Sequence, residues 1–297
     1  MKKHIFAFAA LCLFASSAWV AVAQEAAPYT PPKVLRIGRE EVKPGKDAAH
    51  EKMEAAWARA FADAKAGDHW IGMTSLTGNN EVWFVSRYDS LAEIEKNQQD
   101  LDKNPALKEI NAKYAAQEAE YLSAMHTVVA VYHDDLSYQG VKTNTGLMRY
   151  LYVTTVRVRP GHTADFEAAT KMSRAAHEKA NVPERWSVFE VNEGMPRGTY
   201  LILEPLKSLA DVDNFVTTHG QTYRDAIGDE GRKKLAELNS AGTISTETNI
   251  FAFSPAMSNA PIDVAAADPA FWTPKPAKKA AAAAPAKESD KKTAAKP

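Results

Sequence analysis

Cysteine is nearly absent from this chain of 297 residues, and its absence limits how the protein can be stabilised. The single cysteine, Cys12, lies in an apolar stretch near the N-terminus. Leu11 precedes it, where a lipoprotein signal requires a small residue, so lipidation is excluded. The rest of the chain forms no disulfide and depends on an ordinary hydrophobic core.

Metal-binding motifs are also missing. The eight histidines form no H-E-x-x-H or H-x-H pattern, and no cluster of cysteine and histidine occurs. The sequence therefore predicts no metal site from spacing. His50 and His177 both occur in Ala-His-Glu-Lys. We expect them at the margin of a helix face that packs on a sheet, and a ligand role is the alternative.

An excess of positive charge is found only in the C-terminal segment 274–297. The chain has 36 lysine and arginine residues against 37 aspartate and glutamate residues. The segment 274–297 carries about +5, which leaves about −8 for residues 24–273. A nucleic-acid-binding fold needs a basic surface, so we expect no nucleic-acid partner.

The C-terminal segment 274–297 is almost entirely Ala, Lys and Pro, without apolar periodicity. Such a segment cannot bury enough surface to offset its ordering entropy, so it is predicted to be disordered. A solvated tether is the simplest role. A weak contact with anionic envelope polymers or lipid headgroups is the alternative.

The N-terminus has the three parts of a secretory signal peptide. Lys2 and Lys3 form a basic start, an apolar stretch covers residues 5–22, and Ala21-Val22-Ala23 is a cleavage site. We expect residues 1–23 to be removed and the mature protein to be periplasmic or secreted, without stable membrane insertion. An uncleaved anchor is the alternative, although the apolar run is marginal in length for a membrane span.

A short motif, Val-x-Pro-Gly, occurs twice. The first copy is Val42-Lys43-Pro44-Gly45, and the second, 116 residues later, is Val158-Arg159-Pro160-Gly161. A strand-like run precedes each copy and an alanine-rich helical run follows it. The offset is about one small domain, so we predict two copies of one α+β unit. The predicted divisions are a proline-rich lead at 24–33, a first unit at 34–137, a linker at 138–147, a second unit at 148–258 and an extension at 259–273.

Each unit is predicted to run strand, helix, strand, strand, helix, strand. In the first unit these are 34–42, 47–65, 70–76, 82–88, a helix from 91 interrupted at Asn104-Pro105, and 126–133. In the second they are 151–158, 163–179, 186–191, 200–203, a helix from 208 interrupted by glycines, and 250–253. This order is the split βαβ, ferredoxin-like plan.

The combination of Val-x-Pro-Gly, an amphipathic helix, a hairpin and a second helix that opens with Ser90-Leu91-Ala92-Glu93 or Ser208-Leu209-Ala210-Asp211 resembles the dimeric α/β-barrel superfamily. The resemblance covers residues 34–253. It implies an α+β fold in which two ferredoxin-like units pack sheet to sheet as an intramolecular barrel. The superfamily includes antibiotic-biosynthesis-type monooxygenases, haem-degrading enzymes and chlorite-dismutase-like haem proteins, so haem is a cofactor that the resemblance allows. The haem-degrading members use Asn, Trp and His together, and no Asn here can be matched to that set.

We take as candidate site residues the charged residues and histidines at positions where the two units differ, and the aromatic residues near the hairpins. His126 and His133 flank the last strand of the first unit and could serve as a general base or haem ligand. Surface histidines are the alternative. Alternation places Arg36 and Glu40 on one face of the first strand, and Arg39 and Glu41 on the other. The candidate ligand-binding residues are Arg36, Glu40, Trp70, Trp83, Trp186 and Tyr200. Core packing is the alternative for the aromatic ones.

Three functions are compatible with this pattern. The first is an exported protein that binds a small apolar or aromatic ligand in a barrel pocket. The second is a cofactor-independent monooxygenase or a haem-handling enzyme. The third is an accessory protein with a filled barrel. The volume between the two sheets distinguishes these functions, because a barrel filled by large side chains would leave only the accessory role.

Overall fold

The chain forms two halves with the same order of strands and helices. The structure is a computed structural model that describes residues 31–140 and 144–273, so the predicted signal peptide and C-terminal segment lie outside the described residues. The elements of the first half are β1 (Val34–Val42), α1 (Asp47–Asp63), β2 (Trp70–Ser75), β3 (Glu81–Tyr88), α2 (Leu91–Lys103), α3 (Pro105–Glu118) and β4 (Leu122–Tyr138).

The second half begins after a single helical turn, Thr145–Leu147. Its elements are β5 (Tyr150–Val158), α4 (Thr163–Ala180), β6 (Trp186–Glu193), β7 (Thr199–Leu206), α5 (Ala210–Asn214), a π-helical turn (Phe215–His219), α6 (Gly220–Gly242) and β8 (Thr243–Asn259). Two short helices follow, α7 (Ile262–Ala267) and α8 (Pro269–Trp272).

Local chemistry explains several element boundaries. Gly45 and Gly161 turn the chain after β1 and β5 with φ of +78° and +85°, a region that glycine adopts without a Cβ clash. The hydroxyl of Ser90 accepts a hydrogen bond from the backbone N–H of Glu93 at the start of α2. Asn104 accepts from the first free N–H groups of α3, and Pro105 occupies the first turn. The predicted cap and helix interruption are confirmed.

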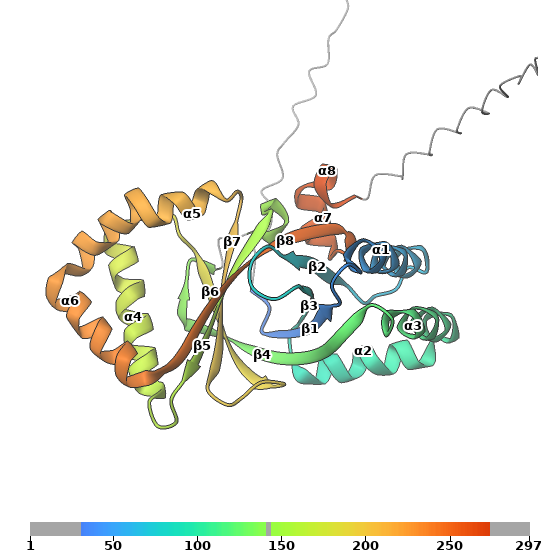
Figure 1. The fold of residues 1–297 in the computed structure, drawn as a ribbon, viewed down its shortest axis with the longest axis horizontal. Helices are drawn as coiled ribbons and strands as arrows, with labels where there is room; N and C mark the ends of the chain where they lie inside the picture. The colour runs from blue at the N-terminus through green and yellow to red at the C-terminus, as the bar shows by residue number, and fades with distance from the viewer. Residues whose placement is uncertain (1–30, 141–143, 274–297) are drawn as a thin grey trace, which may run out of the picture.

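Eight strands close into a barrel in the order β1-β3-β2-β8-β5-β7-β6-β4, with every neighbouring pair antiparallel. Within it, β4-β1-β3-β2 and β8-β5-β7-β6 are two sheets with the ferredoxin-like strand order. The sheets join where β2 pairs with β8 and where β4 pairs with β6. Figure 1 shows the strands at the centre and helices on two opposite sides. The predicted α+β class with an intramolecular barrel is confirmed.

The strands β4 and β8 are longer than predicted. Each has 17 residues, whereas the apolar pattern predicts only 126–133 and 250–253. The additional residues at their C-terminal ends pair with the other half of the molecule, since β4 continues along β6 and β8 continues along β2. The additional residues at their N-terminal ends extend the pairing with β1 and β5. The length of these strands therefore depends on a partner distant in sequence.

Apolar side chains fill the barrel, and α7 and α8 contribute Val264 and Trp272 to the same cluster. The rings of Trp83 and Phe251 meet inside it with centroids 4.7 Å apart. The strand residues of the interior are Leu35, Ile37, Ile71, Met73, Trp83, Val85, Val128, Ala130, Leu151, Val153, Phe189, Val191, Leu201, Leu203, Phe251 and Phe253. The remaining cavity is about 80 Å³, well below the roughly 300–1,000 Å³ of ligand pockets. The interior does not offer the pocket expected from the sequence, because large side chains occupy it.

The helices cover the outer surface of the barrel. Figure 1 shows α1, α2 and α3 on one side and α4, α5 and α6 on the other. Across residues 31–140 and 144–273, none of the helices combines the length and the apolar character needed to cross a membrane.

Candidate functional site

A large cavity lies between the outer face of the second sheet and the helices α4 and α6. Its volume is about 550 Å³, which is within the range of ligand pockets. The sheet side is formed by Val156, Trp186, Ile202, Glu204 and Thr246. The α4 side is formed by Phe166, Ala169, Thr170, Ser173 and His177, and the α6 side by Leu235, Asn239 and Ser240.

The bent path of the helices after β7 leaves room for this cavity. α5 runs through the π-helical turn into α6, which is interrupted at Gly228 with φ of +70°. π-Helical turns are rare and often occur at functional sites. Figure 1 shows α5 and α6 running around the outer side of α4. α6 packs on α4, where the hydroxyls of Ser173 and Tyr223 lie 3.1 Å apart. In the first half, α3 likewise packs on α1, and the rings of Trp57 and Tyr114 stack at 5.8 Å.

His177 contributes a neutral imidazole to the cavity wall. Its Nδ1–H donates a hydrogen bond to the backbone oxygen of Ser173 at 2.8 Å, so Nε2 carries the lone pair of the neutral ring. Burial lowers the pKa of His177, which keeps the ring neutral at pH 7. Trp186 and Tyr223 hold the ring at centroid distances of 4.8 and 4.4 Å. An oriented, unprotonated Nε2 is the form in which histidine binds a metal centre or accepts a proton.

Two glutamates also line the cavity. One carboxylate oxygen of Glu184 lies 2.5 Å from Nδ1 of His219, while its Oε2 is buried without a hydrogen-bond partner. Burial, with the nearby charge of Glu184, raises the pKa of Glu204 to about 7. Glu204 can therefore exchange a proton near neutral pH.

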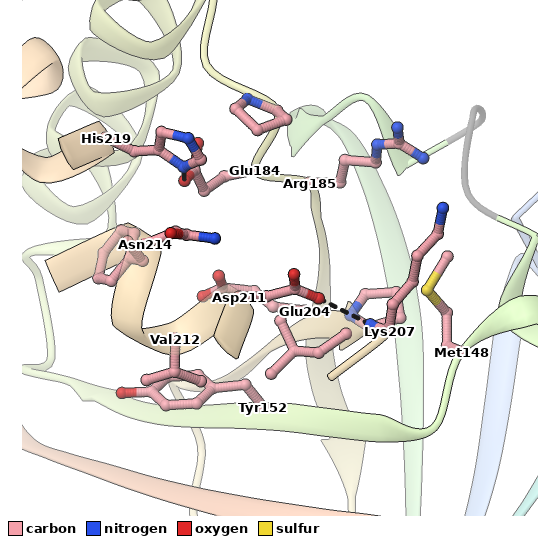
Figure 2. A pocket seen from close by; sticks show the side chains of 14 residues that line it. Met148, Tyr152, Glu184, Arg185, Glu204, Lys207, Asp211, Val212, Asn214 and His219 are labelled. Carbon is pink, nitrogen blue, oxygen red and sulfur yellow. Dashed lines mark hydrogen bonds and ion pairs between the residues drawn. The ribbon is translucent and has the colours of Figure 1, made fainter. Parts of the chain in front are cut away.

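A smaller lobe of about 210 Å³ extends the cavity and shares Glu184, Glu204 and Phe215 with it. Figure 2 shows Asp211 and Glu204 near the middle of this lobe, with Lys207 beside them. Arg185 also lines it. The lobe thus places Arg185 and Lys207 beside the carboxyl groups of Glu184, Glu204 and Asp211, next to the aromatic lining of the large cavity.

The inward face of β1 carries Arg39, and the opposite face carries Arg36 and Glu40. Arg39 forms an ion pair with Glu81 at 2.9 Å and lies 5.0 Å over the ring of Trp83. Trp83 points into the barrel and donates from Nε1 to Glu81 at 2.7 Å. Arg36 is exposed on the helix-facing side, and Glu40 is buried there.

The other aromatic candidates lie on the outer face of the barrel. Trp70 packs edge to face on Phe61 of α1 with ring centroids 5.2 Å apart. Tyr200 packs on Phe166 of α4 at 4.3 Å. Trp186 lines the large cavity. Of the ligand-binding residues predicted from the sequence, Trp186 is the one that lines the cavity between the second sheet and the helices α4 and α6.

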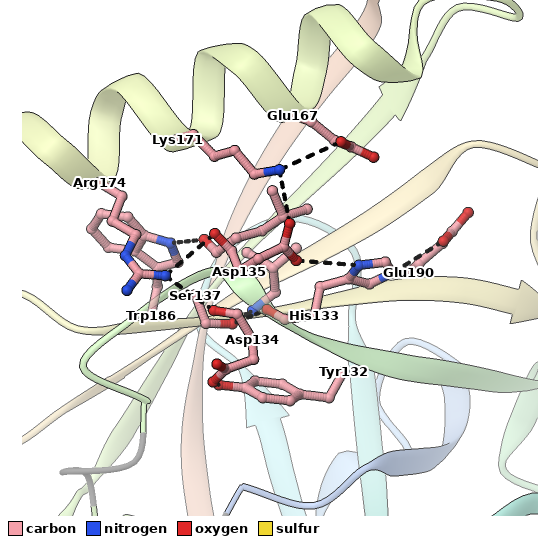
Figure 3. A network of polar contacts seen from close by, with 12 residues as sticks. Tyr132, His133, Asp134, Asp135, Ser137, Glu167, Lys171, Arg174, Trp186 and Glu190 are labelled. Atoms are coloured by element: carbon pink, nitrogen blue, oxygen red, sulfur yellow. Dashed lines mark hydrogen bonds and ion pairs between the residues drawn. The ribbon is translucent and has the colours of Figure 1, made fainter.

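The two histidines predicted from the sequence lie elsewhere. His126 is exposed, with Nε2 4.0 Å from a carboxylate oxygen of Glu41. His133 lies between Glu190 at 3.1 Å and Asp135 at 3.9 Å. Figure 3 shows that His133 belongs to a network of polar contacts with side chains of α4, including Lys171. Neither histidine is among the residues that line the cavity.

Sequence reasoning missed two residues of the cavity, Glu184 and Glu204, and it gave a ligand role for His177 only as the alternative. The sequence places His177 at the margin of its helix face, but its side chain is buried. A signal was present, because His177 follows Phe166 by 11 residues, close to three helical turns, and so shares its inward face. No sequence signal identifies Glu184 or Glu204, because their surroundings depend on the path of α5 and α6.

Comparison with known proteins gives matches among solved structures alone. No protein-family model and no curated protein sequence matches the chain. A candidate monooxygenase from Fusobacterium nucleatum is 11% identical, with a TM-score of 0.49 over 75% of this chain and 93% of that chain. An anthrone oxidase-like protein is 13% identical, with a TM-score of 0.48 over 77% and 94% of the two chains.

A single-residue variant of the chlorite dismutase from Candidatus Nitrospira defluvii is similar as well. It is 10% identical, with a TM-score of 0.46 over 76% of this chain and 93% of that chain. The structures that the chain resembles are thus monooxygenase-like, anthrone oxidase-like and chlorite dismutase proteins.

Proposed function

We propose that this chain is an exported haem-binding protein whose ligand occupies the cavity between the second sheet and helices α4 and α6. The observation that carries the proposal is a cavity of about 550 Å³ with a neutral histidine, His177, in its wall. The proposed ligand site is therefore this cavity and not the barrel interior, where about 80 Å³ remains.

The residues of the cavity fit the chemical parts of a haem. Phe166 and Trp186 give it an aromatic, apolar lining. His177 would hold the haem iron through Nε2, and Arg185 and Lys207 in the outer lobe would supply positive charge to the propionates. When bound, haem supplies one-electron and oxygen chemistry that amino-acid side chains lack. Glu204, whose pKa burial raises to about 7, can hold or release a proton in the same cavity.

Titration with haemin tests this assignment. We expect one haemin per chain and a shift of the Soret band at micromolar concentrations. His177→Ala removes the nitrogen that would hold the iron, so it is expected to weaken binding at least about tenfold and to change the Soret position. The control is His126→Ala, which removes an exposed histidine outside the cavity and should leave both readouts unchanged.

Two outcomes would contradict the haem assignment. One is wild-type protein that gives no spectral shift. The other is loss of binding in His126→Ala but not in His177→Ala. An aromatic ligand that binds without any Soret signal would instead favour a cofactor-independent monooxygenase, in which Glu204 would act as the base that takes a proton from a phenolic substrate.

Export is tested by the N-terminus of the mature protein. The signal segment predicts cleavage after Ala23, so the protein recovered from a bacterial periplasm should begin at Gln24. Intact-mass measurement checks this, and Ala23→Tyr is expected to block processing because the site requires a small side chain. Recovery of the protein with residues 1–23 still attached would show an uncleaved anchor.

A further inference from the structure

Four ionisable side chains are buried together in the first half of the molecule. Glu40 comes from β1, His50 and Glu54 come from α1, and Glu118 comes from the last turn of α3. Each is less than 10% exposed, with values of 6%, 1%, 3% and 7% in that order. Buried ionisable groups are rare unless they are paired or bind a metal.

The side chains converge on one point. Nε2 of His50 lies 2.8 Å from Oε2 of Glu40 and 3.8 Å from Oε1 of Glu54. One ligand atom from each of these three residues lies within 4.8 Å of the others. Glu118 joins the group through a hydrogen bond with Glu40. The i, i+4 spacing of His50 and Glu54 directs both from one face of α1.

One oxygen of the cluster has no partner. Oε1 of Glu54 is buried and makes no hydrogen bond, and the residue is 3% exposed. It points toward the imidazole of His50. A buried oxygen without a donor is costly in a folded protein and calls for a ligand that can satisfy it.

Positive charge is what the cluster lacks. Three carboxyl groups, those of Glu40, Glu54 and Glu118, are buried together with one imidazole, that of His50. Within residues 31–140 and 144–273, Glu40 and Glu54 form ion pairs with His50 and with no lysine or arginine. A divalent cation would supply the missing charge.

The fold itself does not require this cluster. At the same offset of 116 residues the second half has Val156, Phe166 and Thr170, in place of Glu40, His50 and Glu54. These three residues line the large cavity of the second half, so apolar and hydroxyl side chains suffice at equivalent places. A polar cluster that the architecture can omit suggests a binding role.

We propose that Glu40, His50 and Glu54 form a binding site for one divalent first-row transition-metal ion, such as Mn²⁺, Fe²⁺ or Zn²⁺, and that Glu118 positions Glu40. Carboxylates combined with an imidazole match the ligand preference of these ions. Mg²⁺ and Ca²⁺ prefer oxygen ligands alone, so they are disfavoured. Binding requires Nε2 of His50 to present its lone pair and the carboxyl groups to release their protons.

Metal titration of the full-length, chelator-treated protein tests this proposal, with Mn²⁺ or Zn²⁺ as the probe. We expect calorimetry to give one ion per wild-type chain, and Mg²⁺ to bind at least about tenfold more weakly than Mn²⁺. Glu54→Gln keeps the side-chain shape but removes the charge, and is expected to weaken Mn²⁺ binding at least about tenfold. The matched control is Glu51→Gln, the same change at an exposed position of α1, which should bind like the wild type.

Thermal unfolding adds a readout that does not depend on calorimetry. Saturating Mn²⁺ should raise the Tm of the wild type and of Glu51→Gln, but not that of Glu54→Gln or Glu40→Gln. The proposal is overturned if the wild type binds no stoichiometric ion, or if folded Glu54→Gln and Glu40→Gln bind Mn²⁺ as tightly as the wild type. It is also overturned if Mg²⁺ and Mn²⁺ bind equally.

Discussion

Replacing Phe251 by alanine is expected to lower the free energy of unfolding by about 3–5 kcal/mol. Phe251 is 2% exposed and packs against Trp83 inside the barrel. It lies on β8, opposite Leu151 of β5 on one side and Ser75 of β2 on the other, so its ring belongs to both halves of the molecule. Because interiors are close-packed, the lost ring leaves a cavity that neighbours fill only in part. Urea unfolding followed by circular dichroism measures the change.

Phe215→Ala is the matched control, because Phe215 is 43% exposed. The same chemical change should cost less there, about 1 kcal/mol or less, since little apolar surface leaves a packed environment. A loss below about 1 kcal/mol for Phe251→Ala would show that the barrel interior is loosely packed. The barrel would then again be a candidate for the ligand pocket.

The metal-free protein is expected to lose stability as pH rises from about 6.5 to 9. The three buried glutamates have folded pKa values of about 7, 8 and 9, for Glu40, Glu118 and Glu54, against 4.5 as their ordinary value. In this window the folded state holds protons that the unfolded chain has already released, so the free energy of unfolding falls with rising pH. Burial lowers the pKa of His50 from 6.5, so His50 makes the free energy of unfolding rise with pH. This opposing effect is confined to pH values below about 6.5.

The expected loss over this window is on the order of a few kcal/mol, since one unit of pKa corresponds to about 1.4 kcal/mol. Chemical denaturation at pH 6.5, 7.5 and 9 in the presence of a chelator measures it. Glu54→Gln should flatten the dependence, because glutamine mimics the protonated acid at every pH, while Glu51→Gln should keep it. Stability that rises across this window in the chelated wild type would contradict the raised pKa values.

Much of the fold can be predicted from the sequence. The paired Val-x-Pro-Gly motifs end β1 and β5, where Gly45 and Gly161 adopt positive φ. Ser90 and Asn104 cap α2 and α3 as their positions indicate. These features depend on residues within a few positions of one another, so the local sequence contains the relevant physics. The same reasoning predicts the order of elements in each half.

The candidate sites were less accessible to sequence reasoning. Alternation along β1 separates Glu40 from Arg39, but it does not say which face is inward, because both faces of the sheet are covered. Contact with α1 decides that Glu40 is buried beside His50. Glu54 could have been associated with His50 from their i, i+4 spacing, whereas Glu118 is 64 positions further along the chain and joins them only through the packing of α3 on α1.

The sequence by itself determined the nature and order of the strands and helices, because caps, turns and periodicity act over short distances. Tertiary structure alone decided the length of β4 and β8, the filling of the barrel, and the position of the large cavity. Each of these depends on contacts between segments far apart in the chain. The same strand–helix–strand plan consequently holds a buried cluster of glutamates and histidine in one half and a cavity with His177 in the other.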